Sequence, residues 1–519
     1  MDISVPLFLT SGLFLGWTLG ANHLANVFGT AIGTRMISWA TAAVTCAIFV
    51  ALGAVISGAG PSATLGKLGA VNAIGGAFTV ALAAAIVMFW MTRLGLPVPT
   101  TQAIVGAIIG WNVFTASVTD PQTLTEIVLA WIAGPVIAAV VAILLLKVMA
   151  GVKRCYRPHL LRADAYTRIG LWVAGAFGAY SLGANNIANV MGVFVPVTPF
   201  SSFSVGNLFS LSPVELLFLL GGIAIAVGVL TYSRRVVHTI GSELLDMSPL
   251  AAWIIVMAHS IVLFIFSSEG LEHLLASRGL PTLPLVPMSS SVVVIGAVIG
   301  IGLYHSGRQI RWRSLGRIGL AWLISPILAG MICFVGLFVM QNLFLVPVYQ
   351  QVSFAITPPV EKRMAAAGLP MAPLADLGEK TFRSAVAFRD AIRQKVRLTE
   401  EQESEVLRLA EVSPIHFEPE KVATIAIPWL TPAQQNAVRD LSGKLFPAKW
   451  AVAEALAGLS AEWKLRPDTK INKLHNRQIE EGLALIYQTF GVHRPAPAPA
   501  PGACPCTPET APRQKEQGG

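Results

Sequence analysis

A series of long apolar stretches constrains the fold of this chain more than any other feature. They lie at about residues 4–33, 38–59, 73–92, 125–148, 168–198, 213–232, 250–267 and 318–342. Each is long enough to cross the hydrocarbon core of a bilayer, which is about 30 Å thick. Backbone polar groups find no water in lipid, so such stretches fold as helices. The sequence therefore predicts an all-α, polytopic membrane protein.

The composition supports a membrane protein and argues against other classes. Only 13% of the residues are charged and the mean hydropathy is +0.64, whereas soluble domains carry about 25% charged residues. A signal peptide would not explain apolar stretches that recur along the chain, and no small-residue cleavage site follows a short apolar run. The net charge of +9 is explained by basic residues that cluster in short loops between apolar stretches, and no basic stripe with interleaved aromatic residues is present in the sequence. Nucleic-acid binding is therefore not expected.

The membrane part of the sequence contains an internal repeat. The matching segments are Gly20–Gly29 with Gly183–Gly192, Pro97–Gly110 with Pro287–Gly300, and Trp131–Pro135 with Trp322–Pro326. Three matches in the same order indicate a duplication, and an odd number of membrane passes between the copies implies inverted topology. Inverted repeats place a substrate near the bilayer midplane, where paired broken helices meet. We predict a transporter of two inverted repeats with broken helices or re-entrant hairpins.

The predicted organisation has five parts. They are membrane repeat 1 (1–152), a basic cytoplasmic linker (153–167), membrane repeat 2 (168–345), a soluble helical appendage (346–492) and a disordered tail (493–519). The basic loops near 153–168, 234–235 and 308–317 are separated by pairs of apolar passes, so they share one face, assigned to the cytoplasm. The last span then carries the appendage to the outer face of the cell membrane.

Two short segments, about 97–117 and 286–305, begin with proline and hydroxyl residues and are predicted to form half-helices. Their hydroxyl residues are Thr100, Thr101, Ser289, Ser290 and Ser291. Ser and Thr at such positions can simply cap a helix. The same geometry presents free backbone N–H groups and a positive dipole end, which together form an anion site. Opposed half-helices could thus enclose an oxyanion without any arginine.

Two pairs of asparagines are spaced to share one helical face. Asn22 and Asn26 are four residues apart, as are Asn185 and Asn189, and that spacing places both amides of a pair on the same side. Amides in an apolar span are costly unless they are bonded, so they hold helices together or line a polar cavity. Identical placement in both repeats favours the cavity.

Several titratable residues accompany these motifs. His23 lies inside the first motif, where it could relay protons or form a neutral hydrogen bond. Arg35 and Arg93 are expected to anchor the ends of spans. Four further residues are expected near loops or helix ends, without a functional role: Glu243, Asp246, His259 and Glu269.

At these motifs the chain resembles the inorganic phosphate transporter family over about residues 8 to 342. That family carries Gly-Ala-Asn-Asp-x-x-Asn-Ala and Pro-Val-Ser-Thr-Thr-His elements in each repeat. The resemblance implies that Asn22, Asn26, Asn185 and Asn189 line the substrate and coupling-ion sites. It also implies that Thr100, Thr101, Ser290 and Ser291 contact the anion, and that transport is coupled to sodium or protons.

The chain departs from the family pattern at its most polar positions. His23 and Asn186 stand where the family has aspartates, and Gln102 and Val292 stand in place of the histidine. Without the two carboxylates, protons are favoured over sodium as the coupling ion, with His23 and Asn186 as coupling positions. Gln102, beside the threonines, and Ser289 join the predicted substrate-binding set. No metal site or cofactor is expected.

The same departures leave the substrate open between phosphate and sulfate. Phosphate near neutral pH carries a proton that needs an acceptor, and ionised carboxylates are acceptors only. Sulfate carries no proton, so losing both aspartates removes a filter against it. Phosphate is favoured by the resemblance, and a sulfate or related oxyanion permease is the alternative.

Other protein classes fit less well. A membrane enzyme would need carboxylate pairs, a metal constellation or an activated nucleophile, and none is arranged in this way. A channel would not require paired broken helices, which are typical of alternating access. A transporter-like sensor, signalling through residues 346–492, stays open. The expected partners are the oxyanion and membrane lipid, with a homodimer as one candidate assembly.

Overall fold

The computed structural model describes most of the chain. Described are residues 4–69, 71–94, 99–156, 159–198, 200, 203–205, 209–234, 237, 248–304, 312–370, 372–378, 380–424, 430–467, 469 and 472–491. The predicted disordered tail, 493–519, lies outside these residues, as do parts of the basic segments near 157–158, 235 and 308–311.

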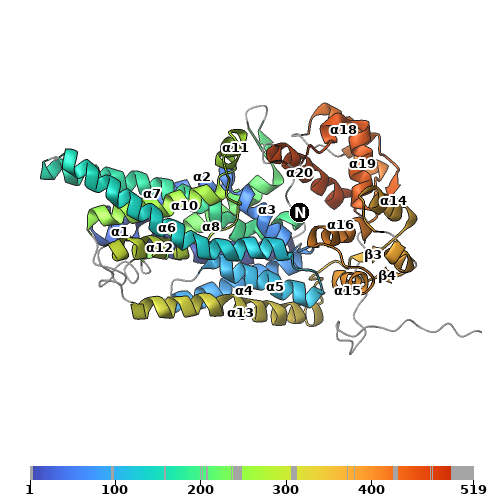
Figure 1. Cartoon of the computed structure of the whole chain (residues 1–519), viewed down its shortest axis with the longest axis horizontal. Coiled ribbons are helices and arrows are strands. Elements are labelled where there is room, and N and C mark those ends of the chain that lie inside the picture. The colour runs from blue at the N-terminus through green and yellow to red at the C-terminus, as the bar shows by residue number, and fades with distance from the viewer. Residues whose placement is uncertain are drawn as a thin grey trace, which may run out of the picture.

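The membrane part is a bundle of helices whose long axes run along the length of the molecule (Figure 1). Its first half holds α1 (Ser4–Gly33), α2 (Trp39–Ser57), α3 (Ala59–Leu68), α4 (Ile74–Arg93), α5 (Thr100–Thr115) and α6 (Pro121–Cys155). Its second half holds α7 (Leu160–Met191), the 3-10 helix η1 (Gly192–Val197), α8 (Pro213–Thr231), α10 (Pro249–Ser267), α11 (Glu269–Ser277), α12 (Ser290–Tyr304) and α13 (Trp312–Asn342). A hairpin of β1 (Phe203–Val205) and β2 (Phe209–Leu211) precedes α8.

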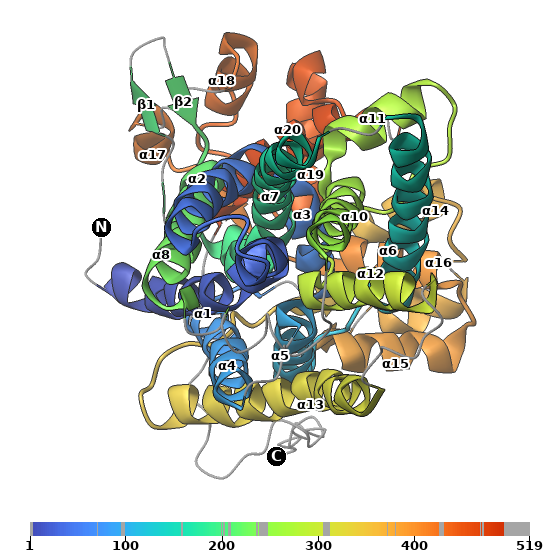
Figure 2. The same cartoon turned by 90° about the vertical axis from the view of Figure 1, so that its left-hand side faces the viewer.

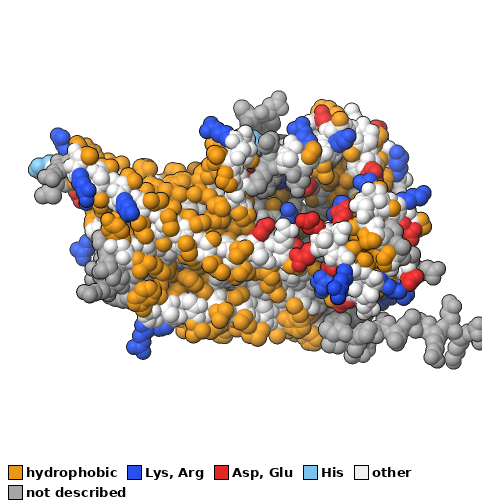
Figure 3. All heavy atoms as spheres, viewed as in Figure 1, with side chains coloured by type: hydrophobic (Ala, Val, Ile, Leu, Met, Phe, Trp, Pro, Cys, Tyr) orange, Lys and Arg blue, Asp and Glu red, His pale blue; other side chains and the backbone are white. Residues whose placement is uncertain are grey.

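The all-α membrane architecture predicted from the apolar stretches is confirmed. Among the described residues, six helices are long and apolar enough to cross a bilayer: α2, α4, α6, α8, α10 and Leu315–Asn342 of α13. The helices α1 and α7, with 30 and 32 residues, are not among these six, and they carry the asparagine motifs. On the face drawn in Figure 3, apolar side chains cover a broad band across the middle of the molecule, as lipid contact requires.

The two short segments form half-helices, as predicted. α5 has 16 residues and α12 has 15, which at 1.5 Å per residue gives less than the thickness of the hydrocarbon core. Both are almost entirely buried along their length. Non-helical backbone at membrane depth is tolerated only when protein surrounds it, so this burial is what allows helices to begin there.

Matched glycines show that the two halves exchange equivalent contacts. A Cβ at Gly20 of α1 would strike the Ile225 carbonyl of α8, and a Cβ at Gly183 of α7 would strike the Val50 carbonyl of α2. Each repeat therefore presses its first helix against the second helix of the other. The duplication is thus visible in packing, while the inverted orientation in the membrane stays a prediction.

The half-helices are packed in the same reciprocal way. Gly106 of α5 lies against the Pro326 carbonyl of α13, and Gly296 of α12 lies against the Pro135 carbonyl of α6. These prolines belong to the third sequence match. Each half-helix is thus supported by the last helix of the other repeat, as the end-on view in Figure 2 shows for α5 with α13 and α12 with α6.

The predicted basic linker is mostly helical rather than a loop. Residues 153–155 end α6 and residues 160–167 begin α7. With 35 residues, α6 is about 52 Å long, so its basic end extends well past the span needed to cross lipid. Lys and Arg side chains gather at this end in Figure 3, opposite to the appendage.

The appendage folds into two small modules with separate hydrophobic cores, one centred on Phe388 and the other on Phe417. The first contains β3 (Ser353–Ala355), α14 (Pro358–Ala366), η2 (Ala372–Leu377), β4 (Thr381–Phe382), α15 (Ala385–Lys395), α16 (Glu400–Ala410) and β5 (Glu411–Val412). The second contains β6 (Ile415–His416), α17 (Pro419–Thr424), α18 (Pro432–Arg439), β7 (Leu445–Phe446), α19 (Lys449–Leu459), η3 (Ala461–Trp463) and α20 (Lys473–Phe490). The expected helices are therefore joined by short antiparallel strands.

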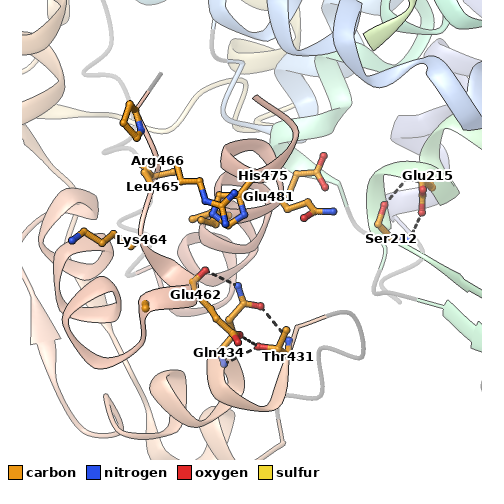
Figure 4. A pocket seen from close by; sticks show the side chains of 14 residues that line it. Ser212, Glu215, Thr431, Gln434, Glu462, Lys464, Leu465, Arg466, His475 and Glu481 are labelled. Atoms are coloured by element: carbon orange, nitrogen blue, oxygen red, sulfur yellow. Dashed lines mark hydrogen bonds between the residues drawn. The ribbon is translucent and has the colours of Figure 1, made fainter. Parts of the chain in front are cut away.

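The appendage contacts both repeats. The Val386 amide donates to the Ala116 carbonyl after α5, at 3.3 Å. On the other side Arg477 of α20 forms ion pairs with Glu269 of α11 and, at 2.9 Å, with Glu481. A cavity of about 870 Å³ lies between the start of α8 and the second module. Figure 4 shows the hydrogen bonds within each wall of this cavity. On one wall Ser212 bonds to Glu215. On the other wall Thr431 bonds to Gln434 and Glu462.

We predict that Arg477→Gln loosens the attachment of the appendage. The change leaves two partly buried carboxylates together without a cation, which we expect to cost between about 1 and 3 kcal/mol. Hydrogen exchange should speed up in α11 and α20 and stay unchanged in α4. Arg168→Gln is the matched control, because it removes an ion pair with Asp164 that is about half exposed. Equal exchange in wild type and Arg477→Gln would contradict the prediction.

Candidate transport site

The site is built around two asparagines that reach from one repeat to the other. Asn26 on α1 donates through Nδ2 to Ser290 Oγ at 3.1 Å and Ser291 Oγ at 3.2 Å, at the start of α12. Asn189 on α7 donates through Nδ2 to Thr101 Oγ1 at 3.0 Å, at the start of α5. The second asparagine of each motif thus bonds to the half-helix of the opposite repeat.

The first asparagine of each motif is engaged elsewhere. Asn185 both donates to the Met288 carbonyl, at 2.6 Å, and accepts from the Met288 amide, at 2.8 Å. It therefore fixes the extended segment before α12. Asn22 is half-buried and donates to Thr18 O at 2.8 Å and Thr92 Oγ1 at 2.7 Å. The structure thus places Asn22 against α4 rather than against a half-helix.

The hydroxyl side chains at the starts of the two half-helices have different hydrogen-bonding roles. Ser289 Oγ accepts from the Val292 amide at 3.4 Å, which is a capping role for α12. Thr101 donates to the Met288 carbonyl at 3.3 Å, so it links the two half-helix starts. The α5 cap position is Pro99, which has no side-chain cap. Thr100, beside it, has a buried Oγ1 that finds no partner among the described residues.

Two buried acceptors beside these hydroxyls also lack partners among the described residues. They are Gln102 Oε1 and Asn189 Oδ1. Gln102 is 5% exposed and Asn189 is fully buried. Leaving buried polar atoms unpaired costs about 1–3 kcal/mol each, so such atoms mark a place where a ligand or water completes the bonding.

A residue without an expected role belongs to this site. His259 was expected near a helix end, but it lies in the middle of α10, fully buried, with Nε2 2.8 Å from Ser290 Oγ. An ionisable side chain inside an apolar stretch is itself a functional signal, and that signal was available in the sequence. His23 Nδ1 lies 2.9 Å from the Leu19 carbonyl. Since a carbonyl only accepts, Nδ1 carries the proton and Nε2 is the basic nitrogen.

The site is polar but uncharged. Along the described residues of α1, α5, α10 and α12 there is no Asp, Glu, Lys or Arg, and α7 carries such residues only at positions 162–168. Positive potential at the site comes instead from the N-termini of α5 and α12. Across the part of the chain that is described, no group of His, Cys, Asp and Glu residues could hold a metal ion. Hydroxyl and amide groups at helix starts are suited to a small oxyanion.

The sequence of this chain matches one known protein family over most of its length. The phosphate transporter family matches residues 19–272 and 280–432. The chain belongs to the phosphate transporter family. The match includes both asparagine motifs and both half-helices, and it confirms the resemblance seen in the sequence.

Individual relatives agree with this membership. A candidate phosphate permease of Methanocaldococcus jannaschii is 25% identical over 335 residues, covering 64% of this chain and 97% of the relative. A sulfate permease of Bacillus subtilis is 28% identical over 337 residues, covering 63% and 85%. A solved structure titled "The sodium-dependent phosphate transporter" matches with a TM-score of 0.52 at 21% identity, covering 65% of this chain and 98% of the other. That likeness supports the fold of this family member.

Proposed function

We propose that this transporter carries inorganic phosphate across the cytoplasmic membrane in symport with protons. The observation that carries the proposal is a pair of buried acceptors, Gln102 Oε1 and Asn189 Oδ1, which have no partner in the described part of the chain. Gln102 lies in the first turn of α5, and Asn189 bonds to Thr101 at the same helix start. Helix N-termini favour the negative oxygens of phosphate, and the free acceptors suit its O–H group. Family membership supports the same substrate.

The predicted substrate-binding residues keep different roles in this proposal. Asn26, Thr100, Thr101, Gln102, Asn189, Ser290 and Ser291 surround the anion, while Asn185 and Ser289 hold the start of α12 in place. Asn22 lies outside this group, because both of its donor bonds go to Thr18 and Thr92.

Proton coupling is proposed from the residues near the anion. His23 has one basic nitrogen, Nε2, and Asn186 donates to the Leu182 carbonyl at 3.1 Å and accepts from Asn189 at 3.1 Å. A carboxylate would stabilise a bound sodium ion through its opposite charge, and the described site residues include none. Because a solved relative is titled as sodium-dependent, sodium has to be tested directly.

Sulfate is the second candidate substrate. A sulfate permease is among the relatives, and His23 and Asn186 add no negative charge that would repel a dianion. Sulfate would, however, leave the acceptors of Gln102 and Asn189 without a hydrogen-bond donor. Losing a buried polar partner discriminates strongly between otherwise similar substrates.

The appendage is proposed to face the outside of the cell. It packs at the end of the bundle opposite to the basic ends of α6, α7 and α13 (Figure 3). Basic residues near membrane ends mark the cytoplasmic side.

The decisive experiment is uptake of radiolabelled phosphate and sulfate into liposomes containing the purified protein. We expect saturable phosphate uptake that an inward proton gradient drives and an inward sodium gradient does not. Uptake of sulfate with little phosphate would replace the substrate in the proposal. Phosphate uptake that requires sodium at constant pH would overturn the proton coupling and keep the substrate.

A further inference from the structure

We propose that His259 shares the coupled proton with His23, and that Ser290 transmits the protonation state of His259 to the bound anion. This inference rests on the proposed function. It starts from position: His259 lies in the middle of α10, and Ser290 is the first residue of α12. Both side chains are fully buried, and His259 Nε2 lies 2.8 Å from Ser290 Oγ.

The hydrogen bonds of the Ser290 hydroxyl link the protonation of His259 to the anion site. Its hydroxyl has one proton to donate and two lone pairs to accept with. One lone pair accepts from Asn26 Nδ2 at 3.1 Å. The contact with His259 then uses either the hydroxyl proton or the second lone pair, and the protonation of Nε2 decides which.

The two arrangements present different groups to an anion. When Nε2 is bare, the Ser290 hydroxyl donates to it and has no proton left for a ligand. When Nε2 is protonated, it donates to Ser290 Oγ, and the hydroxyl proton is free to bond to an oxyanion. If His259 carries protons on both nitrogens, it also places a positive charge one side chain away from the anion. A neutral ring with its proton on Nε2 also frees the hydroxyl, so net proton uptake favours the anion through the added positive charge. Binding of the anion then favours uptake of the proton in return.

The second ring nitrogen of His259, Nδ1, has an unsatisfied hydrogen-bonding capacity. Nδ1 is buried and has no partner among the described residues. Because a buried imidazole nitrogen without a partner is costly in either protonation state, the arrangement is suited to a change of state rather than to static packing. This distinguishes His259 from a histidine whose two nitrogens are both satisfied in a helical core.

The helices packed against α10 carry one other buried histidine. α10 packs against α1, α3, α6, α7 and α12, and among the described residues of α1 the titratable side chain is that of His23, which is 1% exposed. The remaining titratable residues of these helices are Lys67 of α3, Glu126, Lys147, Lys153, Arg154 and Cys155 of α6, Arg162, Asp164, Tyr166, Arg168 and Tyr180 of α7, and Tyr304 of α12.

Two neighbouring imidazoles do not readily carry charge together, because like charges oppose each other. The pair of His23 and His259 is thus expected to take up one proton per cycle rather than two. His259 reaches the anion site through Ser290, whereas the protonated Nδ1 of His23 is directed to the Leu19 carbonyl of its own helix. His259 therefore transmits the proton to the anion, and His23 limits the pair to a single charge.

The test compares two transport modes in liposomes: net phosphate uptake driven by a proton gradient, and phosphate–phosphate exchange at equal pH. Net uptake needs the proton to bind and leave, whereas exchange needs only the anion site. For His259→Gln we expect net uptake to fall at least about 10-fold, with loss of its dependence on pH, while exchange stays within about threefold. Ser267→Ala is the control on the same helix, because the Ser267 hydroxyl donates to the Leu263 carbonyl of α10 and has no other bond among the described residues.

A second pair of variants keeps the test decisive if His259→Gln does not fold. Ser290→Ala retains the imidazole and removes the transmitting hydroxyl, so we expect its uptake to lose the pH response. Ser291→Ala weakens anion binding but keeps the pH response, because Ser291 bonds to Asn26 and not to His259.

Proton-driven uptake with wild-type pH dependence in His259→Gln or Ser290→Ala would overturn the inference. Loss of both transport modes in a folded His259→Gln protein would also overturn it, since His259 would then only support the site. The same measurements are made with sulfate. If wild type carries sulfate alone, the proposed substrate fails while the role of His259 is still tested.

Discussion

Replacing either Asn26 or Asn189 by alanine is expected to lower phosphate transport by about 10- to 100-fold. Each side chain joins the first helix of one repeat to the half-helix of the other, through Ser290 and Ser291 or through Thr101. Hydrogen bonds that support a charged ligand are worth about 1.5–3 kcal/mol, and about 1.4 kcal/mol corresponds to a factor of ten. Because Asn26 and Asn189 occupy equivalent positions in the two repeats, we expect both variants to lose phosphate transport to a similar extent.

The measurement is the concentration dependence of phosphate exchange in liposomes, with folding checked by size-exclusion chromatography. We expect an increased half-saturation concentration in both variants. Asn342→Ala is the control, because Asn342 is exposed at the end of α13 and, within the described part of the chain, bonds only to the Phe338 carbonyl of its own helix. An unchanged exchange rate in Asn26→Ala or Asn189→Ala would remove these asparagines from the site.

Gly106→Ala and Gly296→Ala are expected to prevent or strongly destabilise folding. A Cβ at Gly106 would overlap with the Pro326 carbonyl of α13, and a Cβ at Gly296 would overlap with the Pro135 carbonyl of α6. Overpacking costs about 1–3 kcal/mol where side chains can adjust. Here the obstacle is backbone of a long helix, so the cost is expected at or above the upper end of that range.

The measurement is the thermal stability of detergent-solubilised protein, followed by loss of the monodisperse chromatographic peak. Gly319→Ala in α13 is the matched control, because nothing lies within 4 Å of a Cβ built there and alanine favours a helix over glycine by about 1 kcal/mol. We expect that control to be at least as stable as the wild type. A Gly106→Ala protein with wild-type stability would show that α5 and α13 can separate without cost.

The fold was largely predictable because lipid restricts a chain to few structures. The apolar stretches gave the helices, and the three sequence matches located the half-helices at α5 and α12. The interlocked packing was not predictable: residues 20 and 183 were recognised as equivalent, but nothing in the sequence states that each contacts a carbonyl of the opposite repeat. Such contacts depend on the three-dimensional path of the chain.

The contacts among the predicted site residues could be foreseen only in part. The asparagine motif suggested four equivalent amides, whereas only Asn26 and Asn189 bond to hydroxyls of the half-helices. Spacing along a helix gives the face that a residue occupies but not the partner that it meets. His259 was overlooked because it lies outside the repeated motifs, although its place within an apolar span made it unusual.

The absence of charged side chains from the described residues of α1, α5, α10 and α12 has an electrical consequence. An anion held there without an accompanying cation crosses the membrane field as a net negative charge, because no charged side chain of these helices travels with it. Moving one elementary charge across 100 mV involves about 2.3 kcal/mol, so an inside-negative cell resists entry of a phosphate that travels alone. Each cation that accompanies the anion cancels one such charge. The number of cations therefore sets whether the membrane voltage opposes, ignores or drives accumulation.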